Sequence, residues 1–181
     1  MKTALIMSCD LVGQSEAAQP GRLCWMEIDA ATGEGLSEPV HLLLHRDRAD
    51  RASWRGMRQM PTPPAAALRW LAEDFRSSRA PHVVADPTSE AHLGMLVERA
   101  ALGSSYRLPF KPLNIAMRES LGLEPGELGI LLAAASHELP PVRADALSAL
   151  RRMQVLWAIV AEARWRLPEI QAALAWAGGP R

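Results

Sequence analysis

The stretch TALIMSCD, residues 3–10, decides the fold of this chain. Its residues up to Cys9 are mainly apolar and partly branched, which is typical of a buried central strand. Asp10 ends the run, and a polar stretch with turn character follows from Gly13 to Gly21. We therefore predict a central strand over residues 3–9, with a carboxylate at its carboxyl end.

Two shorter strands are predicted after this run, at residues 23–29 and 39–44, with a turn signal before each. Short strands joined in this way pair as an antiparallel meander. Further along, the pattern predicts one more strand at 81–86 and a short extended piece at 108–111. The predicted helices cover residues 65–76, about 89–102, 113–121, 126–136, 141–160 and 168–176.

This order of elements predicts an α/β fold. The strand at 81–86 follows a helix, so we expect it to pair in parallel with the first strand through a right-handed crossover. The predicted architecture is a mixed sheet, three antiparallel strands and then parallel strands, flanked by helices. Gly122 is expected to end one helix, Pro125 to begin the next, and Thr88 or Ser89 to cap the helix near residue 90.

The composition limits the classes of function. The chain has 181 residues and a formal net charge of zero, so no global field draws it onto nucleic acid or a membrane. Its length predicts one domain, residues 1–181, with a core over 3–165 and a C-terminal helix and tail over 166–181. No apolar run is long enough to span a bilayer, and we expect a cytoplasmic protein. Cys9 and Cys24 are expected to be buried free thiols.

A second carboxylate, Asp145, opens the longest helical run, PPVRADALSALRRMQVLWAIV at residues 140–160. That run places one apolar stripe on the helix: Ala146, Leu150, Met153, Trp157 and Val160. Taken alone, Asp145 is explained as an acid in the first turn of a helix, where the helix dipole favours it. Taken alone, Asp10 is explained as a strand-end residue satisfied by a turn. The alternative is that the two acids bind a cation together.

With these two acids, the order of elements over residues 3–160 resembles the DnaQ-like (DEDD) 3′–5′ exonucleases, which have a ribonuclease-H-like fold. Members begin with a strand that ends in Asp-x-Glu; here Asp10 matches the Asp, and Val12 stands where the Glu belongs. Asp145 matches the last acid of the third motif. The His position of that motif is Pro140, and His137 lies three residues earlier.

The second motif of the family follows its fourth strand and leads into a helix. The corresponding passage here is ADPTSEAHLG, residues 85–94. The position of the expected acid falls on Ala91 or His92, with Glu90 next to it. A glutamate reaches further than an aspartate, so Glu90 could restore the missing ligand.

The resemblance implies a metal-dependent exonuclease that acts on the ends of single-stranded DNA or RNA. Mg²⁺ or Mn²⁺ would then be bound by Asp10 and Asp145, with Glu90 assisting and His137 or His92 positioning water. Hydrolysis by two metal ions needs several carboxylate oxygens, however, and two of the expected acids are missing. The alternative is an eroded, non-catalytic relative that binds nucleic acid or a protein partner. A third alternative is an α/β domain without any link to nucleic acid, because fold does not settle function.

An arginine-rich segment, residues 46–58, is the second candidate site. Arg51, Arg55 and Arg58 share one face if the segment is helical. They would bind phosphates while Trp54 stacks on a base. The alternative is an ordinary solvated face, because two aspartates in the same segment neutralise part of its charge.

Two tryptophans near the C-terminus, Trp165 and Trp176, fall outside the apolar stripe of the long helix. We expect them to cover one edge of the domain or a partner chain. An exposed apolar surface there would favour self-association or a protein partner.

Overall fold

The computed structural model describes residues 2–12, 19–44, 62–102, 106–136, 139 and 145–177, with the backbone alone at 11, 12, 19, 20, 174 and 177. The described strands form a five-stranded sheet in the order β3-β2-β1-β4-β5. Their bounds are Thr3–Val12 for β1, Gln19–Asp29 for β2, Val40–Leu43 for β3, Val83–Ala85 for β4 and Phe110–Pro112 for β5. β1, β2 and β3 pair antiparallel, whereas β4 and β5 join β1 in parallel. The predicted mixed sheet is confirmed.

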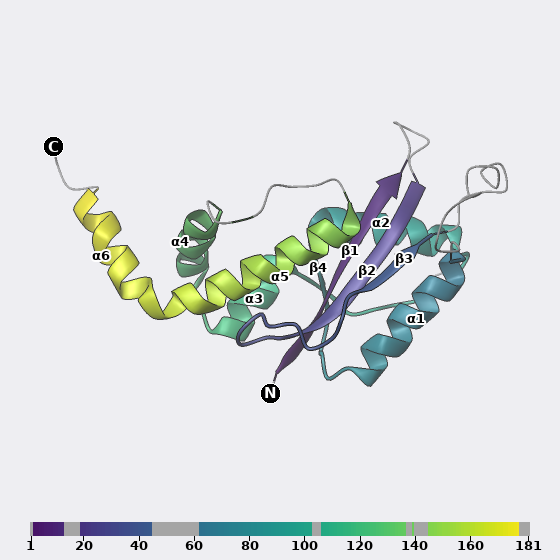
Figure 1. The fold of residues 1–181 in the computed structure, drawn as a ribbon, viewed down its shortest axis with the longest axis horizontal. Helices are drawn as coiled ribbons and strands as arrows, with labels where there is room; N and C mark the ends of the chain where they lie inside the picture. The colour runs from purple at the N-terminus through teal and green to yellow at the C-terminus, as the bar shows by residue number, and fades with distance from the viewer. Residues whose placement is uncertain are drawn as a thin grey trace.

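Helices pack on both faces of this sheet (Figure 1). On one face lie α1 (Pro64–Ser77) and α2 (Pro87–Arg99). On the other lie α3 (Leu113–Leu121), α4 (Pro125–Ala135) and α5 (Ala146–Ala163). A short 3-10 turn, Arg164–Arg166, leads from α5 into α6 (Leu167–Ala177), which continues beyond the sheet at the left of Figure 1.

The central strand β1 organises both cores. Successive side chains of a strand point to opposite faces, so Leu5 and Met7 pack with α1 and α2, whereas Ala4 and Ile6 pack beneath α3, α4 and α5. Ile6 and Met7 are fully buried, and burying each such side chain contributes about 1.5–3 kcal/mol. The apolar run that predicted a central strand is therefore buried from both sides.

The helix ends follow the sequence signals in part. Gly122 ends α3 in the left-handed conformation, with φ 68°, and Pro125 is the first residue of α4; both predictions are confirmed. The predicted cap at Thr88 or Ser89 is wrong, because Asp86 caps α2 by accepting from the backbone N–H groups of both residues. Pro87 takes the first helical position, where its missing N–H costs nothing, and this moves the cap to the residue before it.

The long helix α5 begins later than predicted. Its first residue is Ala146, and Asp145 is its N-cap rather than a member of the first turn. The predicted apolar stripe is confirmed, since its five residues are all buried. Residues 140–144, where the prediction placed the start, lie outside the described residues.

The turn after β2 closes against α5. Trp157 of α5 is fully buried and donates its Nε1–H to the carbonyl oxygen of Ala30 at 3.2 Å. Gly33 in the same turn has φ 76°, and a Cβ placed on it would lie 2.5 Å from the backbone nitrogen of Ala158. This turn therefore requires glycine both for its backbone conformation and for its close approach to the helix.

The C-terminal part differs from the rest in its exposure. Trp165 and Trp176 are 76% and 88% exposed, so neither covers an edge of the described sheet. Among the described residues, no helix has both the length and the apolar character needed to cross a membrane.

Gly33→Ala should lower the free energy of unfolding more than Gly122→Ala does. Both glycines have positive φ, so both variants should pay about 1–2 kcal/mol for the left-handed conformation. Only Gly33 faces the backbone of α5, whereas a Cβ at Gly122 meets no atom within 4 Å. The added overlap should cost Gly33→Ala a further amount of about 1–3 kcal/mol. Urea unfolding of both variants measures the difference, and equal losses would contradict the packing of this turn on α5.

Candidate functional site

A cavity of about 340 Å³ opens at the carboxyl ends of β1 and β4. The end of β1 and the first turns of α2 and α5 form its walls. Seven of the ten lining residues have polar side chains: Ser8, Asp10, Asp86, Thr88, Ser89, His92 and Asp145. The β1–β2 register shifts between Asp10 and Leu11, and irregularities of this kind often re-aim a side chain beside a functional site. This cavity is the candidate functional site.

Asp10 lies between the sheet and α5. Its Oδ2 accepts a hydrogen bond from the backbone N–H of Ala146 at 3.0 Å and lies 3.6 Å from Nη1 of Arg22. Its Oδ1 is buried and has no hydrogen-bond partner among the described residues. Burial raises the pKa of Asp10, and the negative charge of Asp145 raises it further, while the Ala146 amide and Arg22 lower it. The negative charge of Asp10 is thus partly compensated at Oδ2, whereas Oδ1 has no hydrogen-bond partner among the described residues.

Asp145 serves its own helix. Its Oδ1 accepts from the backbone N–H of Ser148 at 2.8 Å, and its Oδ2 accepts from the hydroxyl of the same residue at 2.7 Å. A side chain in this position satisfies donors that a helix start otherwise leaves free. The structure therefore brings Asp10 and Asp145 to the same cavity, but both carboxylates accept hydrogen bonds from other groups of the protein.

A buried polar network links β1 to α2. The Ser89 hydroxyl donates to Asp86 Oδ2 at 2.7 Å and accepts from the Cys9 N–H at 3.2 Å. Because its one proton points to Asp86, the Ser8 hydroxyl must donate to it across 3.2 Å. His92 Nδ1 lies 2.8 Å from the Cys9 carbonyl oxygen. A carbonyl only accepts, so Nδ1 carries the hydrogen. His92, one of the two positions where the resemblance places the second acid, thus binds the strand.

Glu90 does not join this cavity. Its side chain is exposed and lines a separate cavity of about 510 Å³ with Leu93, Val97 and Tyr106. The orientation of α2 about its axis explains this. Ser89, Leu93 and Leu96 are its buried residues, and Glu90, which follows Ser89, points outward. The expected assistance by Glu90 therefore has no geometric basis here.

The remaining predicted site residues cannot be placed. His137, Arg51, Trp54, Arg55 and Arg58 lie outside the described residues. Sequence reasoning did not single out Arg22, Ser8 or Asp86 as site residues. Only Asp86 carried a local signal, since an Asp directly before a Pro is a common helix start.

The cysteines offer no nucleophile. Cys9 and Cys24 are buried and free, as predicted. Burial raises the pKa of each thiol to about 12. Because the thiolate is the reactive form, both side chains remain inert near neutral pH.

The donor set does not fit a pair of metal ions. In the part of the chain that the structure describes, no group of three or more His, Cys, Asp or Glu side chains is arranged to hold a metal. Two metal ions held close together require several anionic ligands. Asp10 Oδ1 is the oxygen of this site that has no hydrogen-bond partner among the described residues. The roles of Asp10 and Asp145 as metal ligands stay a prediction.

Comparison with solved structures identifies the fold. The nuclease domain of 3′hExo, a DEDDh family member bound to rAMP, has a TM-score of 0.57 at 6% identity, over 91% of this chain and 92% of its own. A 3′-exonuclease that recognises the end of a histone mRNA stem-loop has a TM-score of 0.54 at 7% identity, over 91% and 82%. E. coli exonuclease I in complex with a dT13 oligonucleotide has a TM-score of 0.52 at 14% identity, over 96% and 43%.

The chain has the ribonuclease-H-like fold of the DEDD exonucleases. No protein-family model matches it, and no curated protein matches it significantly. It spans less than half the length of the exonuclease I structures, 44% and 43%. Identities this low show the fold alone.

Asp10→Asn should unfold at pH 7 with a free energy at least equal to that of the unmodified protein. The amide oxygen still accepts from Ala146, and the cost of burying a charge is gone. Because the pKa of Asp10 is raised in the folded state, ionisation opposes folding above that pKa, and the opposition disappears as the pH falls through it toward 3.8, the ordinary value. The advantage of the variant should therefore shrink in acid, as measured by urea unfolding across pH.

Asp10→Ala is the matched comparison. It leaves the buried Ala146 N–H without its acceptor, which should cost about 1–3 kcal/mol. If Asn proved as damaging as Ala at pH 7, the described role of this carboxylate would be wrong.

Proposed function

We propose that this domain binds the ends of single-stranded DNA or RNA at the carboxyl edge of its sheet and does not hydrolyse them. One observation supports the absence of hydrolysis: Asp10 and Asp145 both accept hydrogen bonds from other groups of the protein. Asp145 gives both oxygens to Ser148, and Asp10 gives Oδ2 to Ala146. Hydrolysis by two metal ions would need these oxygens and further ligands as well.

Arg22 supports the same conclusion. It is paired with Asp10 in the β1–β2 register, and its guanidinium lies 3.6 Å from Asp10 Oδ2. A guanidinium stays charged at every relevant pH. Arg22 thus places a positive charge beside Asp10. This charge weakens the binding of a cation at Asp10 and reduces the repulsion between Asp10 and a phosphate.

The anchor points of the arginine-rich segment support nucleic-acid binding. Arg22 pairs with Asp10 on one side and with Leu43 on the other, so these residues form one row across β1, β2 and β3. Neighbouring strands lie about 4.8 Å apart, which places the end of β3 about 10 Å from Asp10. Leu44 then pairs with Thr62, so the intervening chain leaves and re-enters the fold near this row.

The residues between these anchors include the predicted nucleic-acid contacts. Arg51, Arg55 and Arg58 would bind phosphates, and Trp54 would stack on a base. Stacking of bases on aromatic side chains beside a positive groove is how many proteins bind single strands without sequence preference. These residues lie outside the described structure, so their roles rest on the anchors and on the sequence.

The double variant Arg55→Gln/Arg58→Gln should bind a short single-stranded oligonucleotide more weakly than the unmodified protein. Loss of two phosphate contacts should also reduce the slope of log K against log salt by about 1.4, at roughly 0.7 per contact for single strands. Fluorescence anisotropy over a range of salt concentrations measures both quantities.

Arg79→Gln/Arg166→Gln is the control, because it removes the same charge from exposed positions elsewhere. If both double variants lost the same affinity for the oligonucleotide, the effect would be explained by the change in net charge alone. The absence of any salt-dependent binding would refute the proposed function and favour a protein partner, with the exposed Trp165 and Trp176 as the first surface to probe.

A second candidate function is a weak metal-dependent exonuclease. It is favoured by Asp10 Oδ1, a buried carboxylate oxygen without a hydrogen-bond partner among the described residues. Mg²⁺ and Mn²⁺ prefer oxygen ligands, so one ion bound weakly at this atom would fit. The described donor set is too small for more.

Incubation of the protein with end-labelled single strands should yield no product ladder with either Mg²⁺ or Mn²⁺. The reason is the missing ligand set, and gel analysis of the labelled ends is the measurement. A ladder that disappears in Asp10→Asn would establish the second candidate instead. A ladder that persists in Asp10→Asn would indicate a contaminating nuclease, and the preparation would be repurified and tested again.

A further inference from the structure

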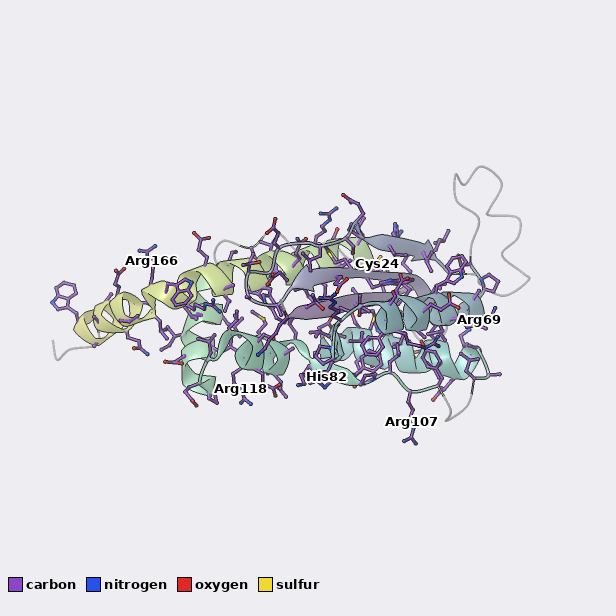
Figure 2. All side chains as sticks on the ribbon, turned by 90° about the horizontal axis from the view of Figure 1, so that it is seen from below. Cys24, Arg69, His82, Arg107, Arg118 and Arg166 are labelled. Carbon is purple, nitrogen blue, oxygen red and sulfur yellow. The ribbon has the colours of Figure 1, made fainter. Side chains whose placement is uncertain are left out.

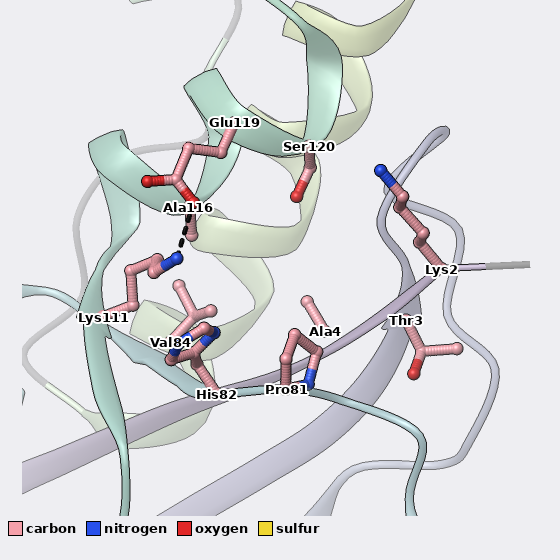
Figure 3. A pocket seen from close by; sticks show the side chains of 10 residues that line it. All are labelled: Lys2, Thr3, Ala4, Pro81, His82, Val84, Lys111, Ala116, Glu119 and Ser120. Carbon is pink, nitrogen blue, oxygen red and sulfur yellow. Dashed lines mark hydrogen bonds and ion pairs between the residues drawn. The ribbon is translucent and has the colours of Figure 1, made fainter.

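A third cavity, of about 220 Å³ (Figure 3), lies at the end of the sheet opposite Asp10. The amino ends of β1 and β4, together with β5 and α3, form its walls. Its polar lining residues are Lys2, Thr3, His82, Lys111, Glu119 and Ser120. Asp10 lies eight positions after Lys2 along β1, a span of about 26 Å at the usual rise of a strand. This cavity is therefore independent of the proposed nucleic-acid site.

The parallel arrangement of the strands collects the basic side chains here. Lys2 directly precedes β1, His82 directly precedes β4, and Lys111 lies on β5 opposite Val84. Parallel strands begin at the same edge of a sheet, so residues far apart in the chain meet. The chain contains only two lysines among its 20 basic residues, and both line this cavity.

The side chains are arranged around an apolar floor. Figure 3 shows the amino group of Lys2 and the hydroxyl of Ser120 on one side of the hollow, and His82 with Lys111 on the other. The floor consists of Ala4, Val84 and Ala116, which are all buried. Donors thus surround a small space from several directions, over a floor of apolar side chains, and Glu119 is the acidic side chain of the lining.

The charge of this region is positive. Lys111 forms an ion pair with Glu119 and is 21% exposed. The hydrogen bond from Lys111 is the main cause of the lowered pKa of Glu119, and the charges of Lys111, Arg118 and His82 lower it further. Figure 2 shows Arg118 and His82 on the same side of the molecule. Two lysines against one glutamate leave an excess of positive charge around the hollow.

We propose that this cavity binds a compact phosphate anion, either inorganic phosphate or the phosphate group of a small phosphomonoester. Lysine is a common phosphate ligand because it acts as a point charge with three donors. The volume is below the roughly 300–1,000 Å³ of pockets that enclose whole small molecules. The site therefore takes the anionic group itself, and any organic part of the ligand stays outside.

Glu119 sets the strength of the site. It orients Lys111 but also places a negative charge at the rim, which opposes an incoming anion. Glu119→Gln should therefore tighten phosphate binding, whereas Lys2→Gln and Lys111→Gln should weaken it, each by about fivefold for one near charge in a solvated site. A general effect of net charge predicts the same signs, so the site is distinguished by Arg166→Gln, which removes the same charge far from the cavity and should leave the affinity unchanged.

The test is an NMR titration of the full chain with inorganic phosphate at constant ionic strength, following the backbone amides of Ala4, His82 and Ser120. We expect saturable shifts at these amides and the changes in affinity given above. Arg166→Gln is the control, because Arg166 lies on the projecting C-terminal part (Figure 2) and should leave the affinity unchanged. The lysines are at or near the surface, so these variants should fold, and circular dichroism checks that they do.

A parallel titration with ribose 5-phosphate separates the two sources of the anion. Tighter binding of the monoester or of inorganic phosphate identifies the ligand, and either result supports the site. Shifts that do not saturate, or that respond equally to Lys2→Gln and Arg166→Gln, would overturn the proposal. Arg55→Gln/Arg58→Gln should not alter phosphate binding, so failure here is distinguishable from failure of the proposed nucleic-acid function.

Discussion

The hydrogen bond from the Ala146 N–H to Asp10 connects the sheet to the layer of helices that covers one of its faces. It joins the end of the central strand to the start of the longest helix, across 136 positions of sequence. A carboxylate is favoured at a helix N-terminus because the first N–H groups there lack partners and carry partial positive charge. The contact fixes where α5 begins, and α5 in turn covers the even-numbered face of β1 and the turn at Gly33.

This contact gives a physical reason for acids to stand at these positions whether or not they bind a metal. Asp145 caps its own helix, Asp10 accepts from that helix, and Asp86 caps α2. Each carboxylate accepts from backbone donors at a helix start, where the first N–H groups have no partner within the helix. Acids in the places of a metal centre are therefore weak evidence for a metal until their oxygens have been accounted for.

The sequence predicted what depends on local pattern, and it missed what depends on register. The apolar run of β1, the stripe of α5 and the stops at Gly122 and Pro125 all follow from spacing or from single residues. Arg22 meets Asp10 only because β2 pairs with β1 in one register. Glu90 faces outward because the Asp86 cap, misassigned by two or three residues, sets the phase of α2. An error of one position in a helix start turns a candidate ligand away from its site.

The packing of α5 has a consequence for how the chain acquires its structure. The hydrogen bond between Trp157 and Ala30 spans 127 positions, and contacts of such long range slow folding because the loop must close before they form. The antiparallel meander precedes α3, α4 and α5 in the chain, so the face that contains Ala4, Ile6 and Met26 is fully covered only after residues 113–163 have been synthesised. Apolar surface that is exposed during folding in this way favours aggregation.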